Sequence, residues 1–372
     1  GSPALPAVER PAATKTPYAS YSIATAEAAK TSFKRVCATL VDEACAELAL
    51  YEVGSSEVAW IRAMLEYNVV GGKMNRGLMV VEAGRLLFEG RGLAVTNDDL
   101  NRFAVLGWCI EWLQGWLLVA DDFMDDSVTR RGRPCWYRVA GVGKIAINDA
   151  FLIEMLLFKT LKRHFQSMPG TIYAQLVDLM METTLQTELG QLLDLRCEHV
   201  ELEEFTRDRW EKIVKYKTAF YSFYLPVAMA MILAGIADAR EFDAARDILV
   251  VMGVYFQAQD DFLDAFGSPE QIGKIGTDIQ DKKCGWLFVN AFHTLCDDDQ
   301  RAFLRTHYGN CKVGSPEERQ IKQLYADLGL PKLYADYEQA SYDKIQTLKH
   351  TVKLVPWSVF EAFLKKIYKR SK

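Results

Sequence analysis

The chain has 372 residues, of which 50% are hydrophobic and 25% are charged, with a formal net charge of −5. This amount of apolar material supports a sizeable core and excludes a disordered or fibrous chain. The acidic balance disfavours broad electrostatic binding to nucleic acid or an anionic membrane, so we expect no nucleic-acid partner.

The first 20 residues predict a flexible N-terminal arm. They are rich in Ala, Pro and Thr, lack the apolar core of a signal peptide and begin with a Gly-Ser pair typical of a cloning scar. The most apolar stretch of the chain, Tyr221 to Ile236, contains Ser222 and Pro226. It is too short and too polar for a membrane span, so we predict a buried helix kinked near the proline.

Helical periodicity runs through almost all of the remaining chain, without alternating strand patterns or a linker that would divide it. This pattern predicts an all-α fold, a single-domain helical bundle over residues 21–372. The expected helices cover residues 25–50, 57–69, 76–89, 98–120, 147–166, 171–196, 204–235, 238–264, 284–295, 298–307, 315–328, 331–348 and 356–368.

Cysteine usage indicates the compartment. None of the eight cysteines falls in a CxxC pair, and several, such as Cys109, lie inside apolar runs. This pattern predicts reduced, buried thiols in a cytoplasmic protein and not a disulfide framework or a zinc site.

Two segments, 104–120 and 248–264, are apolar on nearly all sides, which is typical of helices in the centre of a bundle. The first contains Glu111 and Gln114, two polar residues that need partners if they are buried. Both segments end in an acidic cluster, and these clusters carry the chemistry.

The two clusters have the same pattern, Asp-Asp-Phe-x-Asp, at residues 121–125 and 260–264. Their first and fifth aspartates share a helix face, where like charges repel and the negative helix end adds to the repulsion. A positive partner must offset this cost, and carboxylates are the ligands that Mg²⁺ prefers. A single cluster is compatible with a solvated helix end, whereas two copies predict a metal site.

Basic residues accompany both clusters in glycine-containing loops. Arg130, Arg131, Arg133 and Arg138 follow the first cluster, and Lys274, Lys282 and Lys283 follow the second. Upstream, Lys73 and Arg76 lie in Gly-Gly-Lys-Met-Asn-Arg-Gly, where we expect them to share a helix face; the glycine spacing is not that of a P-loop. Carboxylates for a metal beside cations for an anion indicate binding of a metal–diphosphate complex.

The chain resembles the trans-prenyltransferases, specifically the farnesyl diphosphate synthases of eukaryotes, from about residue 50 to its end. The resemblance is carried by GGKMNRG at 71–77, LVADDFMDDSVTRRGRPCWY at 118–137, GQLLDL at 190–195, IVKYKTAFYSFYLP at 213–226, FQAQDDFLD at 256–264, GKIGTDIQDKKC at 273–284 and the tail KIYKRSK.

This resemblance implies a central active-site cavity, three Mg²⁺ ions, isopentenyl and allylic prenyl diphosphates as substrates, and a homodimer. Metal ligands are implied at Asp121, Asp125, Asp260 and Asp264, with Asp122 and Asp261 in support. The allylic diphosphate is expected to contact Arg130, Lys217 and Lys274, with Lys283 close by. The diphosphate of isopentenyl diphosphate is expected to contact Lys73, Arg76, Gln114, Arg131 and, from the tail, Arg370. The developing carbocation is expected to face Thr218 and Gln257, with Tyr221 and Phe256 nearby.

Product length depends on the floor of the substrate cavity, which the resemblance places at Trp116 and Leu117. Family members that stop at fifteen carbons usually have two aromatic residues there, and Leu117 is smaller than the Phe or Tyr expected. Farnesyl diphosphate is therefore the predicted product, with geranylgeranyl diphosphate as a second or main product in the alternative. The loop 265–285 and the tail 366–372 are predicted to close over the site.

Two further functions remain open. A terpene synthase uses the same scaffold, but it has no second diphosphate for Lys73, Arg76 and Arg131 to bind. A non-catalytic partner subunit is expected to have lost aspartates, whereas both clusters are intact here.

Overall fold

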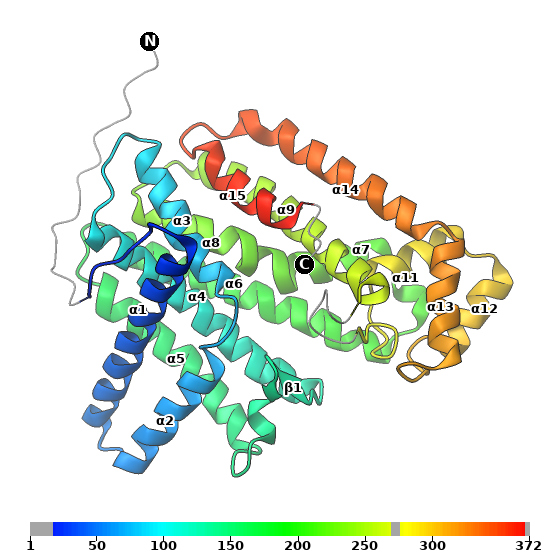
Figure 1. The fold of residues 1–372 in the computed structure, drawn as a ribbon, viewed down its shortest axis with the longest axis horizontal. Helices are drawn as coiled ribbons and strands as arrows, with labels where there is room; N and C mark the ends of the chain where they lie inside the picture. Colours follow the sequence, from blue (N-terminus) through cyan, green and yellow to red (C-terminus); the bar gives the residue numbers. More distant parts are fainter. Residues whose placement is uncertain (1–17, 269–275, 369–372) are drawn as a thin grey trace. The chain divides into compact units, whose positions relative to one another are not determined.

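The structure is a computed structural model that describes residues 18–268 and 276–368, and it is almost entirely helical (Figure 1). The α-helices are α1 (Ala26–Leu48), α2 (Ser55–Asn68), α3 (Asn75–Glu89), α4 (Asn97–Met124), α5 (Ile145–Phe165), α6 (Ile172–Leu195), α7 (Arg207–Val214), α8 (Leu225–Leu233), α9 (Ala239–Phe266), α11 (Trp286–Asn290), α12 (Asp298–His307), α13 (Pro316–Asp327), α14 (Leu330–Thr347) and α15 (Trp357–Ile367). The predicted all-α fold class is confirmed.

Shorter elements connect these helices. The 3₁₀-helices are η1 (Ala49–Tyr51), η2 (Trp136–Arg138), η3 (Arg196–His199), η4 (Leu202–Glu204) and η7 (Leu348–Thr351), and the π-helices are η5 (Lys215–Tyr224) and η6 (Ala291–Leu295). A two-stranded antiparallel hairpin pairs β1 (Thr129–Arg130) with β2 (Arg133–Pro134). The hairpin was not predicted, because strands of two residues are too short to show alternation.

The expected single helix over residues 204–235 is wrong in detail. The structure runs from α7 through the π-helix η5 into α8 without a break, and Pro226 lies just after the π-helix, where a residue without an N–H interrupts the helical hydrogen bonds. The π-helix widens the segment where two neighbouring helices approach its backbone. A Cβ on Gly190 of α6 would lie 2.1 Å from the Lys217 nitrogen, and a Cβ on Gly253 of α9 would lie 2.6 Å from the Ala219 Cα.

The chain divides into two compact units. Unit 1 comprises residues 1–181 and 225–238, and unit 2 comprises residues 182–224 and 239–372. The predicted single domain over residues 21–372, the N-terminal arm and the central cavity stay predictions.

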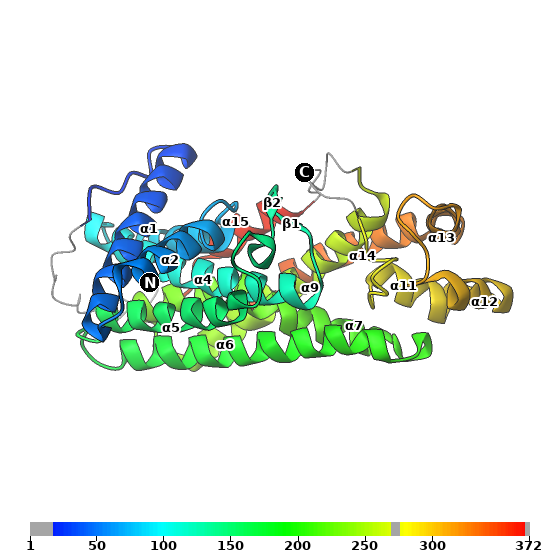
Figure 2. The same cartoon turned by 90° about the horizontal axis from the view of Figure 1, so that it is seen from below.

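The centre of unit 1 is α4, which packs against α1, α3, α5 and α8 and lies alongside α5 in Figure 2. Its length follows from two local signals. Thr96 and Asp99 form a capping box at its start. At its end, Asp126 adopts a left-handed conformation with φ of 51°, and the Ser127 N–H donates to the Asp122 carbonyl, a Schellman-type termination directly after the first acidic cluster.

Unit 2 is organised around α9, which packs against η5, α7, α11, α14 and α15. A buried aromatic cluster that includes Trp210, Trp286, Phe288 and Tyr334 lies beside it. This cluster supplies indole and backbone N–H groups close to the second acidic cluster.

Burial confirms two expectations from the sequence. All eight cysteines lie in the described part of the chain, none forms a disulfide, and only Cys311 is more than slightly exposed. Helix α4 is long and apolar enough to cross a membrane by composition, but 78% of its apolar window is buried inside the protein, as expected for a core helix.

Candidate active site

The first acidic cluster lies at the C-terminal end of α4 in unit 1, and its three aspartates have different surroundings. Asp121 is half-buried, Asp122 is 4% exposed, and Asp125 is exposed at the helix C-cap. Asp121 and Asp125 share one helix face, whereas Asp122 points elsewhere. The aspartates at positions one and five are therefore partly or fully exposed on one face, and the middle aspartate is part of the packing.

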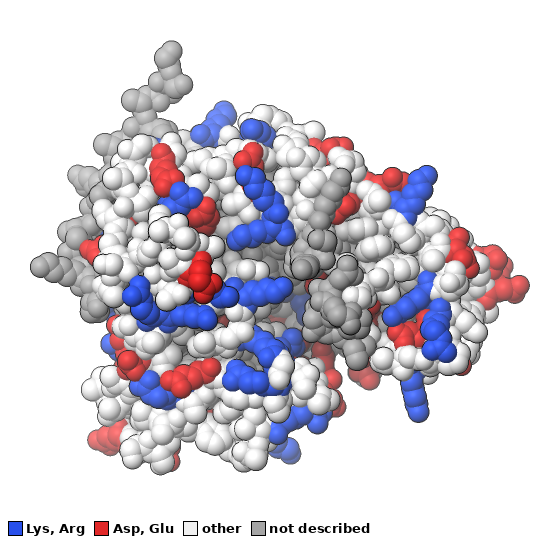
Figure 3. All heavy atoms as spheres, viewed as in Figure 1, with Lys and Arg blue, Asp and Glu red and all other residues white. Residues whose placement is uncertain are grey.

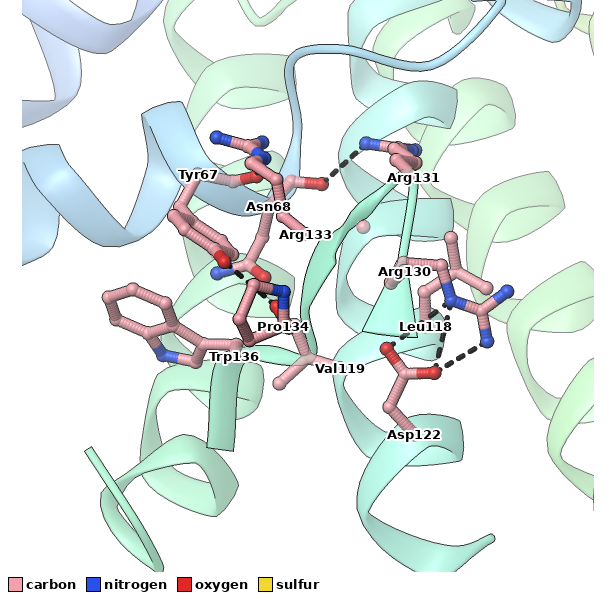
Figure 4. Close-up of a pocket in the computed structure, with 11 residues that line it drawn as sticks. Tyr67, Asn68, Leu118, Val119, Asp122, Arg130, Arg131, Arg133, Pro134 and Trp136 are labelled. Atoms are coloured by element: carbon pink, nitrogen blue, oxygen red, sulfur yellow. Dashed lines mark hydrogen bonds and ion pairs between the residues drawn. The ribbon is translucent and has the colours of Figure 1, made fainter. Parts of the chain in front are cut away.

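Arg130 offsets the negative charge of this cluster from the hairpin. Its guanidinium donates to Asp122 Oδ1 at 2.5 Å and 3.0 Å, and lies 3.4 Å from Asp121 Oδ2 (Figure 4). Charge-assisted, bidentate bonds of this kind fix the direction of the guanidinium. Arg130 is thus held next to Asp121, where a diphosphate bound to a metal at that aspartate would meet it.

Arg131 points to the other side of the hairpin. Its φ of 54° reverses the chain, and its guanidinium donates to the carbonyls of Asn68 at 3.0 Å and Val70 at 3.2 Å (Figure 4). A Cβ on Gly72 would lie 3.0 Å from the same guanidinium, so this glycine leaves room for it. The loop before α3 and the hairpin are therefore joined through Arg131.

The hairpin is fixed to α2 by further contacts. The Arg133 guanidinium lies 4.2 Å from the centre of the Tyr67 ring, and the Tyr67 hydroxyl donates to the Pro134 carbonyl at 2.8 Å. Together with Asn68, Asp122 and Trp136, these residues line a cavity of about 20 Å³, which is large enough for about one water molecule (Figure 4). The arginines are thus mounted on a rigid support.

The α3 segment departs in one respect from its prediction. Arg76 is in the first turn of α3, but Lys73 lies in the preceding loop, because Met74 adopts a left-handed conformation with φ of 54° and interrupts the helix. The two residues therefore do not share a helix face. Lys73 is exposed and Arg76 is half-buried. In the view of Figure 3, Lys and Arg side chains gather over this part of unit 1.

The predicted chain-length floor also lies on α4. Trp116 is buried, Leu117 is half-buried, and Gln114 is half-buried three residues after Glu111. These positions place the two floor residues one turn before the first cluster, within the buried part of the helix.

The second acidic cluster lies near the end of α9 in unit 2, and its middle aspartate is held by neutral N–H donors. Asp261 accepts hydrogen bonds from Trp210 Nε1 at 2.9 Å, the Trp286 backbone N–H at 2.7 Å and Gln257 Nε2 at 3.2 Å. Burial raises the pKa of Asp261 to about 6, and these donors oppose the rise. Asp260, one residue earlier, is half-buried.

Asp264 is buried, unlike Asp125 at the same place in the first cluster. Its Oδ2 accepts from the Asp278 N–H at 3.0 Å, and a Cβ on Gly276 would lie 2.8 Å from the same oxygen. Asp264 thus connects α9 to the segment that begins at residue 276.

A buried carboxylate that the sequence analysis did not assign holds two predicted substrate-binding lysines. Asp194 Oδ2, at the end of α6, accepts from Lys217 Nζ at 2.6 Å and Lys283 Nζ at 3.0 Å. Burial raises the pKa of Asp194, but the two ammonium groups outweigh it and hold the pKa below its usual range. The signal was present in Gly-Gln-Leu-Leu-Asp-Leu, an acidic residue in an apolar run.

The remaining predicted contacts in unit 2 lie on η5 and α9. Thr218 and Tyr221 are half-buried on the π-helix, and Gln257 and Phe256 are half-buried on α9, with the Phe256 ring 5.5 Å from that of Phe223. π-helical turns are frequent at functional sites, because they offset side chains from the regular helical face. Lys274 and Arg370 lie outside the described residues, as do residues 269–275 and 369–372 of the predicted closing segments.

The carboxylates fit a hard divalent cation that shares its coordination with a substrate. Within residues 18–268 and 276–368, no three Asp, Glu, His or Cys side chains converge into a complete metal site. Each cluster instead offers aspartates one helical turn apart, and Mg²⁺ is commonly held by one or two carboxylates together with water and phosphate oxygens.

Comparison with known proteins gives the same family throughout. The family model described as Polyprenyl synthetase matches residues 58–328. A farnesyl diphosphate synthase from Dictyostelium discoideum is 44% identical over 94% of this chain and 92% of its own length. A farnesyl pyrophosphate synthase from Saccharomyces cerevisiae is 46% identical over 91% of this chain and 97% of its own length.

Solved structures extend the likeness to the fold. A T. brucei farnesyl diphosphate synthase complexed with minodronate matches with a TM-score of 0.84 and 31% identity, covering 92% of this chain and all of the other. The same T. brucei enzyme complexed with risedronate matches with a TM-score of 0.80 and 33% identity, over 92% of this chain and 99% of the other.

Proposed function

The chain belongs to the polyprenyl synthetase family, and we propose that it condenses isopentenyl diphosphate with dimethylallyl and then geranyl diphosphate to give farnesyl diphosphate. One observation carries this proposal most directly. Each acidic cluster ends a buried helix, and each unit already holds cations beside buried carboxylates, Arg130 at Asp122 and Lys217 and Lys283 at Asp194. A diphosphate leaving group requires this combination.

The reaction breaks the allylic C–O bond, which leaves a diphosphate and an allylic carbocation. The π electrons of isopentenyl diphosphate then form the new C–C bond, and transfer of a proton from the adjacent carbon to the released diphosphate restores a double bond. Arg130, Lys217 and Lys283 stabilise the negative charge that develops on the leaving group. Thr218 and Gln257 present oxygen atoms to the carbocation, while the aromatic rings of Tyr221 and Phe256 exclude water that would convert it to an alcohol.

Members of this family use a divalent metal, and for this chain we propose three Mg²⁺ ions. Asp121 and Asp125 on α4, and Asp260 with Asp264 on α9, are the proposed ligands. When bound, the metal supplies Lewis-acid stabilisation of the diphosphate oxygens. Titration of activity with Mg²⁺ after chelation, with the bound metal counted by equilibrium dialysis in the presence of diphosphate, tests the number of ions.

The product length is set, in this proposal, by Trp116 and Leu117 one turn before the first cluster. Trp116→Ala should lengthen the product, because the growing chain runs along α4 away from Asp121. An unchanged product in this variant would show that the floor lies elsewhere. Geranylgeranyl diphosphate as a wild-type product would instead indicate that Leu117 leaves extra depth.

We further propose a homodimer. Exposed apolar side chains recur at one-turn spacing along two helices, at Ile147, Phe151 and Met155 on α5 and at Met181, Leu185 and Leu189 on α6. Such stripes are expensive to leave in water and mark protein interfaces. Sedimentation analysis should give twice the monomer mass, and Leu185→Glu with Leu189→Glu should give a monomer.

Two smaller proposals follow from the free cysteines and from the solved relatives. Seven buried thiols are compatible with a reducing cytoplasm, which imaging of the tagged full-length protein tests. Because the T. brucei structures are bisphosphonate complexes, we expect risedronate to inhibit in the presence of Mg²⁺. Full activity at saturating risedronate would contradict this proposal.

The direct test is incubation of the purified protein with isopentenyl and dimethylallyl diphosphates, with and without Mg²⁺, followed by gas chromatography of the dephosphorylated products. Magnesium-dependent farnesol supports the proposed function. If no prenyl alcohol forms, a preformed prenyl diphosphate is supplied instead. Cyclic hydrocarbons would then indicate a terpene synthase, and complete inactivity a non-catalytic subunit.

A further inference from the structure

Glu111 is a buried carboxylate in the middle of α4 for which the proposed reaction has no role. It is 2% exposed, and its Oε1 accepts a hydrogen bond from the Gly77 backbone N–H at 2.8 Å. Burial raises the pKa of Glu111, while the Gly77 amide and the charges of Arg76 and Arg131 oppose the rise. An isolated carboxylate would be costly at this depth, so its surroundings must offset the cost.

The start of α3 supplies the hydrogen-bond donor for the Glu111 carboxylate. Gly77 is the third residue of that helix, and its N–H is one of the amides that no helical carbonyl can reach. Met74 occupies the N-cap position and gives no side-chain hydrogen bond, so α3 has no cap from its own segment. Glu111 supplies this cap from α4, where its charge also favours the positive end of the helix.

Close backbone packing makes this cap possible. A Cβ on Gly77 would lie 2.8 Å from the Gly107 carbonyl oxygen and 2.9 Å from Glu111 Cγ. A Cβ on Gly107 would in turn meet the Gly77 carbonyl oxygen at 2.4 Å. Any side chain at either glycine would separate the two helices, and so the start of α3, which carries Arg76, is tied to α4 at Glu111.

Glu111 also acts through its negative charge. Arg76 and Arg131 both meet the segment that Glu111 holds. Arg76 directly precedes Gly77, whose N–H donates to Glu111. A Cβ on Gly72 would lie 3.0 Å from the Arg131 guanidinium. The negative charge of Glu111 acts on both guanidinium groups. Arginines that converge on one anion repel one another while the anion is absent. A fixed negative charge behind them reduces that repulsion and keeps the side chains directed to the same place.

We propose that Glu111 is a positioning residue, whose carboxylate caps α3 and holds Arg76 and Arg131 together before isopentenyl diphosphate binds. This inference rests on the proposed role of the two arginines as ligands of that diphosphate. A neutral acceptor would be sufficient for the cap, but it would not offset the repulsion between the arginines. The charge of Glu111 is therefore the property to test.

Glu111→Gln removes the charge but keeps the size and the acceptor oxygen for the Gly77 N–H. We expect the KM and the calorimetric Kd for isopentenyl diphosphate to rise about tenfold, equivalent to about 1.4 kcal/mol, because the arginines separate. The kcat and the KM for the allylic substrate should remain close to wild type. An unchanged KM would reduce Glu111 to a helix cap, and a lower KM would mean that its charge only weakens substrate binding; either result overturns the proposal.

Glu241→Gln is the matched control, because Glu241 is also buried and accepts backbone N–H bonds, from Lys353, Leu354 and Val355. It should lose a similar amount of thermal stability without a change in KM. Arg131→Gln tests the proposed role of the arginines separately from the role of Glu111. If it leaves the Kd for isopentenyl diphosphate unchanged, the proposed role of the arginines fails; if it raises the Kd while Glu111→Gln does not, only the inference about Glu111 fails.

Discussion

The two acidic clusters have the same residue pattern but different chemistry around them. In the first, the buried middle residue Asp122 is neutralised by the Arg130 guanidinium, so the charge of the cluster is balanced by another full charge. In the second, the middle residue Asp261 is surrounded by neutral N–H donors from Trp210, Trp286 and Gln257. Identical motifs are therefore stabilised in one unit by an ion pair and in the other by dipoles.

The fifth residues differ as well. Asp125 is exposed at the C-cap of α4, whereas Asp264 is buried and accepts from the Asp278 N–H. Asp264, which we propose as a metal ligand, therefore also holds the segment that begins at residue 276 through its Oδ2, and Asp125 occupies the corresponding position at an exposed helix end. A motif alone thus does not tell which of its carboxylates also hold other segments.

The largest expected effect tests what the two clusters share. Asp121→Ala and Asp260→Ala should each lower turnover by roughly 10²–10³-fold, because each removes a proposed metal ligand, while the circular dichroism spectrum stays that of the folded protein. Asp126→Asn is the control, because Asp126 is exposed and Asn tolerates its positive φ. Wild-type rates in either alanine variant would contradict the assignment.

The next prediction compares the middle aspartates. Asp261→Asn should destabilise the protein by about 2–3 kcal/mol, because the amide NH₂ faces a buried N–H donor that then lacks an acceptor. Asp122→Asn should cost only about 1 kcal/mol, since Arg130 remains accessible to water. Denaturant unfolding of both variants measures the difference, and equal losses would remove the distinction between ion pair and dipoles.

The fifth positions should separate stability from metal use. Asp264→Ala should lower the unfolding free energy by about 2 kcal/mol, because the Asp278 N–H loses its acceptor. Asp125→Ala should change it by less than about 0.5 kcal/mol, as expected for an exposed residue, yet raise the Mg²⁺ concentration needed for activity. Thermal melts of the two variants measure the difference in stability, and Mg²⁺ titrations test the proposed metal role of both aspartates. Equal losses of stability would contradict the additional structural role of Asp264.

A further prediction concerns Asp194, which offsets lysines in unit 2 as Asp122 offsets Arg130 in unit 1. Its pKa is held below the usual range, so its contribution is complete above the ordinary carboxyl pKa of about 3.9 and is lost as the pH falls through the lower folded value. Asp194→Asn should be about 1–2 kcal/mol less stable than wild type at pH 7. This gap should narrow below about pH 4 in denaturant melts, and a gap independent of pH would contradict the ion-pair account.

The regular parts of the fold were readable from the sequence. The predicted helices correspond to the observed ones except where a π-helix intervenes, η6 within residues 284–295 and η5 within residues 204–235. The η5 segment is the longer departure. That departure depends on Gly190 and Gly253, which bring α6 and α9 against the η5 backbone. Those approaches join residues far apart in the chain, so no local pattern announces them.

The candidate site was readable in part. Acidic and basic residues in two glycine-containing segments indicated a metal–diphosphate site, and Glu111 was recognisable as a polar residue in need of partners. Its partner, the Gly77 amide, lies 34 positions away, and the role of Asp194 depends on Lys217 and Lys283 from two other segments. Side-chain partners of this kind are selected by packing and not by sequence spacing.

The sequence by itself determined the helical class, the two buried helices and the identity of the charged residues, because periodicity and composition are local properties. Only the tertiary structure decided which carboxylates are exposed and which are buried and hold other segments through hydrogen bonds. Burial and hydrogen-bond partners determine the cost of leaving a charge exposed or unpaired, and they arise only when distant segments meet. Asp125 and Asp264, the fifth residues of one motif, differ for this reason.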